Sequence, residues 1–291
     1  MAQGDEVTCI ADVQAVLGEG PVWVAREQAL YWVDIVERRL FRWTEGVGAG
    51  IVDIGQGISA LAPRASGGFI GAGEGGFLGI DLESGRIDRL GNPESDRVSN
   101  RFNDGKTDRR GRFWAGTMDR SEREPSGALY RLDRDLSWAG IDDGYRVTNG
   151  PAFSLDGRTM YHSDSALRRI YAFDLGEDGS AANRRVFAEF GSSEGYPDGM
   201  TVDAEDCLWV AFWDGWCLRR LSPCGARLSE LRVPVQQPTS CTFGGPALDR
   251  LFITSARRGL REDALAMQPH AGALFVAEAG VAGVAETPFA G

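Results

Sequence analysis

The chain has 291 residues, of which 43% are hydrophobic and 25% are charged, a composition typical of a soluble globular protein with a large core. Its 31 basic and 42 acidic residues give a formal net charge of −11, and no Lys/Arg-rich run is present. Because nucleic-acid phosphates attract basic surfaces, this charge argues against a nucleic-acid partner.

The first twenty residues lack the basic start and the apolar run of a signal peptide. No stretch approaches the roughly 18 apolar residues that a membrane helix needs. The cysteines are odd in number and match no zinc-binding spacing, which indicates free thiols in a reducing compartment. We therefore expect a cytoplasmic protein with no membrane partner, and the sequence leaves its oligomeric state open.

A strand-forming pattern recurs six times along the chain. Each repeat has a first apolar-aromatic stretch, at residues 30–35, 68–73, 112–117, 160–165, 207–212 and 251–256. A second stretch follows each of these, at residues 40–44, 77–81, 129–133, 170–174, 218–222 and 274–278. Aromatic markers in successive first stretches lie 38, 45, 47, 48 and 43 residues apart, and only residues 260–267 suggest a short helical turn.

Six repeats of about 40–50 residues, each with several short strands, are typical of a β-propeller. We therefore predict an all-β fold in which residues 1–291 form a single six-bladed β-propeller domain. An irregular β-sandwich is the alternative, and the regular spacing disfavours it.

Polar residues recur at one phase of this repeat, eleven or twelve residues before the aromatic marker. They are Glu19, Asn103, Asn149 and Asp198, and each is followed within two residues by glycine. The second and sixth repeats carry Ile58 and Cys241 at this phase, so the polar set is not a turn residue common to all repeats. Since residues at equal phase in a closed ring face one another, we expect the four side chains to converge on the central channel.

Two carboxylates and two amide oxygens that converge would form an all-oxygen site. Hard cations such as Ca²⁺ and Mg²⁺ take such ligands, and Mn²⁺, Fe²⁺ or Zn²⁺ also bind to them. The competing interpretation is that Asp and Asn only cap turns by accepting nearby backbone N–H groups. Four such residues at a matched phase favour a central metal site, whose native ion the sequence does not identify.

The chain resembles the gluconolactonase/regucalcin (senescence marker protein) family of six-bladed sugar lactonases. The similarity extends over essentially the whole sequence and rests on "LGEGPVW", "NRFNDGK", "GRFWAGTM", "TNGPAFSLDG", "YPDGMTVDAEDCLWVA", "TSCTFGG" and "PFAG". It implies one divalent metal ion bound by the residues that match here as Glu19, Asn149 and Asp198.

The resemblance also implies contacts with the substrate. The arginine and first asparagine of "RFND" match as Arg101 and Asn103. Some family members have a further substrate-contacting glutamate after "GTM", where this chain has Ser121. Glu122 or Glu124 is the candidate to replace it, the alternative is that this chain lacks the contact, and we take Glu122 as the predicted contact.

These expectations predict a metal-dependent hydrolase that opens a sugar (aldono) lactone, such as a glucono- or xylonolactone. The ion would polarise the carbonyl and activate water, with Asp198 as the general base. The alternatives are hydrolysis of a non-sugar lactone or an organophosphate-like ester, or a calcium-binding propeller without catalysis. A Ser-His-Asp triad is poorly supported, because His162 and His270 are the only histidines and His162 fits a packed, hydrogen-bonded strand residue better.

The segment "NRFNDGKTD" at residues 100–108 combines the turn signal Asn-Asp-Gly with polar and charged neighbours. We predict a turn that faces the channel. In this interpretation Asp104 forms the turn locally, while Arg101 and Asn103 hold the substrate beside the metal ion.

Overall fold

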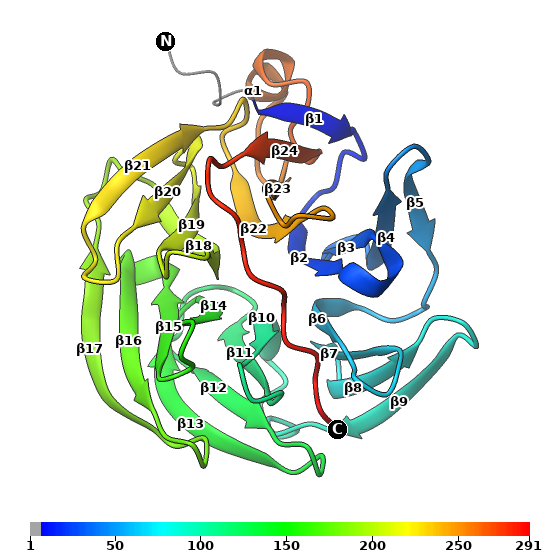
Figure 1. The fold of residues 1–291 in the computed structure, drawn as a ribbon, viewed down its shortest axis with the longest axis vertical. Helices are drawn as coiled ribbons and strands as arrows, with labels where there is room; N and C mark the ends of the chain where they lie inside the picture. Colours follow the sequence, from blue (N-terminus) through cyan, green and yellow to red (C-terminus); the bar gives the residue numbers. More distant parts are fainter. Residues whose placement is uncertain (1–6) are drawn as a thin grey trace. The chain divides into compact units, whose positions relative to one another are not determined.

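Residues 7–291 are described by a computed structural model and form six four-stranded antiparallel sheets (Figure 1). These sheets are the six blades predicted from the repeats, and the all-β prediction is confirmed. Within the same residues there is one α-helix, α1 (Glu262–Met267), at the predicted turn. Two single 3₁₀ turns, η1 (Ala25–Glu27) and η2 (Ser165–Leu167), complete the helical content.

The contacts divide the chain into two compact units, each with three sheets. Unit 1 contains residues up to 53 and 190–286, and unit 2 contains residues 54–189 and 287–291. That residues 1–291 form one domain stays a prediction, and its residues 1–6 lie outside the described part.

Unit 1 holds the first, fifth and sixth sheets in chain order. Their strands, from the innermost outward, are β2 (Gly18–Val24), β3 (Ala29–Asp34), β4 (Arg39–Thr44) and β5 (Gly48–Val52); β18 (Tyr196–Val202), β19 (Leu208–Trp213), β20 (Cys217–Leu221) and β21 (Arg227–Arg232); and β22 (Pro238–Gly244), β23 (Arg250–Ser255), β24 (Leu274–Glu278) and β1 (Thr8–Ala11). The last sheet is therefore completed by the N-terminal strand, which pairs Thr8 with Val276.

Unit 2 holds the second, third and fourth sheets. Their strands are β6 (Ile58–Pro63), β7 (Phe69–Gly73), β8 (Gly76–Asp81) and β9 (Arg86–Gly91); β10 (Asn100–Thr107), β11 (Phe113–Asp119), β12 (Gly127–Leu132) and β13 (Trp138–Tyr145); and β14 (Thr148–Phe153), β15 (Thr159–Asp164), β16 (Arg169–Leu175) and β17 (Ala181–Glu189). The C-terminal segment crosses this unit, since the N–H of Phe289 donates to Pro63 and that of Ala290 to Gly111.

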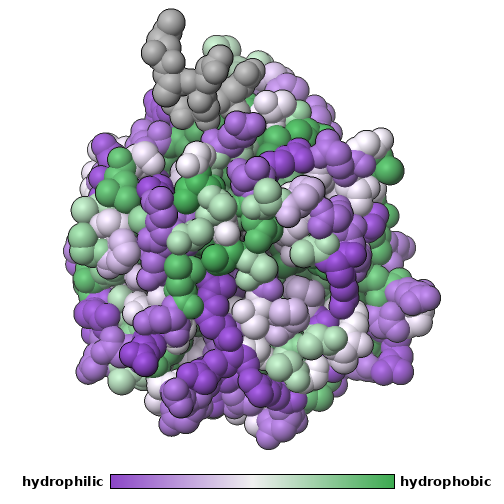
Figure 2. All heavy atoms as spheres, in the orientation of Figure 1, coloured by the Kyte–Doolittle hydropathy of each residue, from purple (hydrophilic) through white to green (hydrophobic). Residues whose placement is uncertain are grey.

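Burial falls from the first to the last strand of each sheet. Every residue of β6 is buried, whereas the last strands β9 and β17 are half-buried or exposed along their length. Aromatic side chains fill the space between neighbouring sheets of one unit, as where Phe77 and Phe102 lie 4.9 Å apart in unit 2. This apolar packing is the main force that holds the sheets together, and polar and apolar residues are interspersed on the face shown in Figure 2.

Each innermost strand contains a break in its register with the second strand. The breaks lie after Glu19 in β2, after Ile58 in β6, around Asn103 in β10, after Asn149 in β14, after Pro197 in β18 and after Pro238 in β22. A β-bulge bends a strand and re-aims the side chain beside it. The polar residues found by phase therefore lie at the bulges of β2, β10, β14 and β18.

The predicted turn at residues 100–108 is wrong, because Asn100–Thr107 form strand β10. Asp104 accepts the N–H of Gly105 at 2.7 Å and that of Gly150, on the neighbouring sheet, at 2.8 Å. The hydrogen bond to Gly150 and the pairing with β11 hold Asn-Asp-Gly in a bulged strand and override its turn preference.

The sixth repeat is also shifted relative to the prediction. The bulge in β22 falls at Thr239, between Pro238 and Ser240, and not at Cys241. The difference has two causes. Strand β22 continues one residue further past its bulge than β10 does. In addition, Phe252, the aromatic residue from which the spacing of the sixth repeat was counted, lies one residue further into β23 than the corresponding aromatic residue lies in β11.

All five cysteines are free thiols, as predicted. No helix among residues 7–291 is long and apolar enough to cross a membrane.

Candidate functional site

A chain of hydrogen bonds in unit 2 links three of the predicted site residues. The Nη1 of Arg101 donates to the Oδ1 of Asn103 at 2.7 Å and to the carbonyl of Phe102 at 2.9 Å. The Nδ2 of Asn103 donates to the Oδ1 of Asn149 at 3.0 Å and to the carbonyl of Thr148 at 2.7 Å. The structure therefore brings Arg101, Asn103 and Asn149 together, across strands β10 and β14.

The orientation of the Asn149 amide follows from its two partners. Its Nδ2 donates to the Oγ of Ser165 at 2.8 Å, so its Oδ1 points toward Asn103. An amide oxygen has two lone pairs, and the N–H of Asn103 occupies one of them. The second lone pair can serve as a ligand to a cation.

Asp104 lies directly beside this chain of bonds. Its two oxygens accept the N–H groups of Gly105 and Gly150, and Gly150 follows Asn149. Burial raises the pKa of Asp104 to about 6, while the two N–H groups and Lys106 act in the opposite direction. Asp104 thus holds β14 against β10, which is a larger role than the local turn predicted for it.

Unit 1 carries the two predicted carboxylate ligands at the bulges of β2 and β18. Glu19 is 6% exposed and Asp198 is 5% exposed. The Oε2 of Glu19 accepts the N–H of Gly20 at 3.1 Å. Gly199 allows β18 to approach β22, since a Cβ there would lie 2.1 Å from the Oγ of Ser240. Both carboxylates are therefore buried, and the backbone beside Asp198 is closely packed.

The predicted ligand types fit a hard divalent cation. Glu19 and Asp198 are carboxylates and Asn149 offers an amide oxygen, which are the donors that such ions prefer. Among residues 7–291 no group of three or more His, Cys, Asp or Glu side chains is arranged to hold a metal ion. The predicted set differs from such a group because one of its three members is an asparagine.

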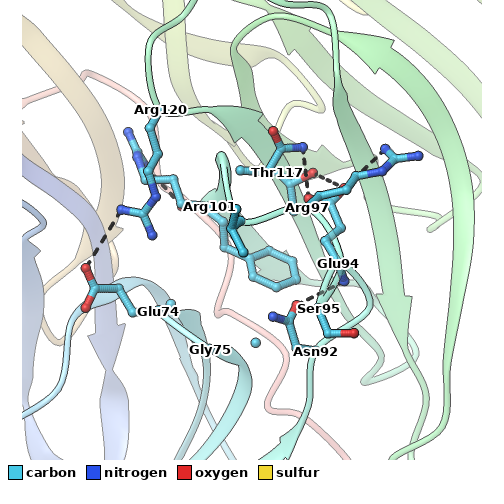
Figure 3. A pocket seen from close by; sticks show the side chains of 14 residues that line it. Glu74, Gly75, Asn92, Glu94, Ser95, Arg97, Arg101, Thr117 and Arg120 are labelled. Atoms are coloured by element: carbon cyan, nitrogen blue, oxygen red, sulfur yellow. Dashed lines mark hydrogen bonds and ion pairs between the residues drawn. The ribbon is translucent and has the colours of Figure 1, made fainter.

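Arg101 also lines a pocket of about 170 Å³ in unit 2 (Figure 3). The charged side chains around it are Glu74, Glu94, Arg97, Arg101 and Arg120. Neither Arg97 nor Arg120 was identified from the sequence. The pairing of β10 with β11 would have pointed to Arg120. It places Arg101 opposite Met118, and Arg120 follows Met118 by two residues, on the same face of the hairpin.

Glu122, predicted as a substrate contact, does not line this pocket. It is exposed, with a φ of 61°, in a turn whose N–H groups at Ser121, Arg123 and Glu124 bind the carboxylate of Asp119. The substrate contact of Glu122 stays a prediction.

Other buried carboxylates are occupied in holding the blades. Asp34 accepts four backbone N–H groups, from Val16, Leu17, Val36 and Glu37. Asp108 and Asp203 each bind the indole N–H of a tryptophan and an arginine Nε. The burial of these three carboxylates is therefore explained by the hydrogen bonds that they accept within the blades, and not by a functional site.

His162 is packed in the sheet, as predicted, with its ring 4.8 Å from that of Tyr145 in an edge-to-face arrangement. Neither ring nitrogen has a hydrogen-bond partner among the described residues, so the predicted hydrogen bond is wrong. Burial, and after it the nearby Arg184, lower the pKa of His162 to about 3. A histidine that is fully buried and neutral is not available as a base.

Comparison with known proteins gives consistent matches along the chain. Residues 17–257 match the family described as the SMP-30/gluconolactonase/LRE-like region. A 6-deoxy-6-sulfogluconolactonase from Pseudomonas putida is 37% identical over 99% of both chains. Regucalcin from Xenopus laevis is 36% identical over 98% of this chain and 99% of its own. The crystal structure of a calcium-binding regucalcin from Agrobacterium tumefaciens superposes with a TM-score of 0.93 at 28% identity, covering 97% of this chain and 96% of the other.

Proposed function

Because this chain belongs to the SMP-30/gluconolactonase/LRE-like family, we propose that it is a lactonase that hydrolyses a sugar lactone to the sugar acid with one divalent cation. The observation that carries the proposal is the position of Glu19, Asn149 and Asp198, each at a bulge of an innermost strand. The named relatives support it, since one is a sugar lactonase and another is a calcium-binding protein.

We assign the cation to Glu19, Asn149 and Asp198. When bound, a divalent cation would polarise the lactone carbonyl and lower the pKa of water beside it. Ca²⁺, Zn²⁺, Mn²⁺, Mg²⁺ and Fe²⁺ all suit oxygen donors to some degree, and the choice among them is left to measurement.

Asp198 is the proposed general base. Its carboxylate takes a proton from the attacking water as the carbon–oxygen bond forms at the carbonyl. It then returns that proton to the ring oxygen as the lactone carbon–oxygen bond breaks. Its burial, at 5% exposure, keeps bulk water from competing for the proton.

Arg101 and Asn103 are the proposed substrate-binding residues. Both hydrogens of the Asn103 amide are used, by Thr148 and Asn149. Asn103 therefore meets a substrate hydroxyl through Oδ1, and it also orients Arg101 for the substrate's oxygens. The substrate is a small molecule, and we place the reaction in the cytoplasm.

The experiment is a chelation and add-back assay on a panel of aldonolactones. Acid release should stop after chelation, return with one of the five cations, and be lost in Asp198→Asn with that cation present. Asp249→Asn changes an exposed aspartate of the same unit and should behave as wild type. Hydrolysis that persists in the stripped protein would refute the metal-dependent mechanism.

A further inference from the structure

The pocket beside Arg101 has an excess of positive charge in an acidic protein. Three arginines and two glutamates contribute to its wall, whereas the chain as a whole carries a formal charge of −11. In Figure 3, Arg101 and Arg120 line one side of the pocket, and Glu94 and Arg97 line the other. A local positive site in a negative protein attracts an anion specifically, because the surrounding surface repels it.

Two of the arginines are placed together by the pairing of β10 and β11. Arg101 lies opposite Met118, and the N–H of Arg120 donates to the carbonyl of Ser99 at 2.9 Å, two residues further along each strand. Arg101 and Arg120 are therefore diagonal neighbours on one face of the hairpin, at a typical separation of about 7–8 Å. Two long arginine side chains that begin from backbone positions at that separation can bring their guanidinium groups to one ligand from two directions.

The buried glutamate of the pocket is already engaged. The carboxylate of Glu94 accepts hydrogen bonds from Asn100 Nδ2 at 3.0 Å, Thr117 Oγ1 at 2.9 Å and Tyr130 OH at 3.0 Å. Its Oε1 also lies 3.8 Å from the Nη1 of Arg97, whose side chain is 52% exposed. The carboxylate of Glu94 is therefore occupied by three hydrogen-bond donors of the protein, and Arg97 lies near it at the exposed rim.

The second glutamate forms a long ion pair with Arg120. Glu74 Oε1 lies 3.9 Å from Arg120 Nη1, beyond hydrogen-bond distance, and both side chains are more than a third exposed. Exposed ion pairs of this kind contribute little to stability. A ligand oxyanion can therefore take the guanidinium of Arg120 without a large loss.

One residue, Arg101, belongs both to the pocket and to the proposed reaction site. Arg101 belongs to the pocket wall and also donates to Asn103, which in turn donates to Asn149. A volume of about 170 Å³ holds a carboxylate, sulfonate or phosphate group with part of a carbon chain, because one water takes about 30 Å³. A substrate held by Arg101 can thus place its far end in the pocket that Arg120 lines.

We propose that this pocket selects lactones whose terminal carbon bears an oxyanion, with Arg120 and Arg97 as the specificity-determining residues. The inference rests on the proposed lactonase function and narrows its substrate class. Carboxylate, sulfonate and phosphate share the chemistry that the arginines recognise, and the substrates below distinguish them.

The test compares kcat/KM for gluconolactone with kcat/KM for its derivatives that carry a terminal carboxylate, sulfonate or phosphate. We expect wild type to prefer at least one of the anionic lactones. Arg120→Gln should lower kcat/KM for that lactone roughly tenfold to a hundredfold, the usual cost of losing a charged hydrogen-bond partner. The same variant should change kcat/KM for neutral gluconolactone less than about threefold, and Arg120→Lys should recover part of the loss.

Arg232→Gln is the matched control, because it removes one exposed arginine on the outermost strand of another sheet. An equal loss for neutral and anionic lactones in Arg120→Gln, or no preference in wild type, overturns the subsite and leaves the lactonase proposal standing.

A second measurement judges the subsite if no lactone is hydrolysed. Calorimetry would then compare binding of glucarate, the open-chain dicarboxylate, to wild type and to Arg120→Gln. Weaker binding to Arg120→Gln than to wild type and Arg232→Gln supports the anion site. Binding that does not depend on Arg120 overturns it.

Discussion

Asn103 is the residue whose replacement tests the hydrogen-bonded site most fully. It is buried, and its amide makes three bonds, two as donor to Thr148 and Asn149 and one as acceptor from Arg101. Asn103→Leu keeps the approximate volume and removes all three. Asn103→Asp keeps the oxygen that accepts from Arg101 but places a second oxygen against the two acceptors, the Thr148 carbonyl and the Asn149 amide oxygen.

The expected magnitude follows from these bonds. A buried group left without its partner costs about 1–3 kcal/mol, and Asn103→Leu leaves the Thr148 carbonyl and the Asn149 amide oxygen short of a donor. We expect a loss of about 2–4 kcal/mol in the free energy of unfolding. For a chain of this size, that loss in the free energy of unfolding corresponds to a fall of roughly 4–10 °C in Tm. Asn103→Asp should lose at least as much, because a carboxylate would stand about 3 Å from two oxygens.

Thermal unfolding followed by circular dichroism measures the effect, with Asn183→Gly as control. Asn183 is exposed, makes a hydrogen bond to Asp174 at 2.8 Å and has a φ of 53°, which suits glycine. Its replacement should change Tm by about 1 °C or less. If Asn103→Leu and Asn103→Asp both melted within a degree of wild type, the network would not be holding β10 and β14 together.

Three further results are expected. Burial lowers the pKa of His162 from 6.5 to about 3, so the stability that the neutral side chain gives is complete above pH 6.5 and is lost as the pH falls toward 3. Between pH 7 and pH 5, wild type should lose about 2 kcal/mol more than His162→Leu in the free energy of urea unfolding. Equal losses would show that His162 is not buried and neutral. Gly199→Ala should destabilise by about 1–3 kcal/mol, because its Cβ would meet Ser240, while Gly50→Ala, with open space around it, should be near neutral in the same assay. Glu19→Gln should weaken calorimetric binding of the activating cation about tenfold or more, and unchanged affinity would remove Glu19 from the ligand set.

Much of the fold followed from the sequence, because a blade is built from short, strongly apolar strands. Stretches such as 30–35 and 112–117 lie close to β3 and β11, since buried strands need aromatic and β-branched residues on both faces. The number of blades was predictable for the same reason. The family was predictable because the innermost strands carry distinctive motifs.

The local structure of β10 was not predictable from Asn-Asp-Gly. That tripeptide favours a turn in isolation, but its pairing with β11 and the contact of Asp104 with Gly150, 46 residues away, hold it in a bulged strand. Sequence reasoning weighs near neighbours and does not see such a partner. The same limit explains the sixth blade, where the bulge at Thr239 depends on the pairing of β22 with β23.

The arginine pocket was missed because its parts are separate in the sequence. Arg97 precedes β10 and Arg120 follows β11, and each alone is indistinguishable from an ordinary surface arginine. The register between β10 and β11 brings Arg120 beside Arg101, and Arg97 lines the opposite side of the same pocket. Glu122, predicted from the glutamate expected after "GTM", lies two residues beyond Arg120, which lines the pocket.

The most direct test of the central proposal is the rate of gluconolactone hydrolysis by chelated protein before and after a divalent cation is restored, in wild type and Asp198→Asn. We predict a rate at the uncatalysed background without the cation and recovery on add-back in wild type alone. Asp198→Asn should stay at least about a thousandfold slower, consistent with loss of a general base that also binds the cation. Full activity in the chelated wild type, or in Asp198→Asn, would contradict the proposed role of these residues.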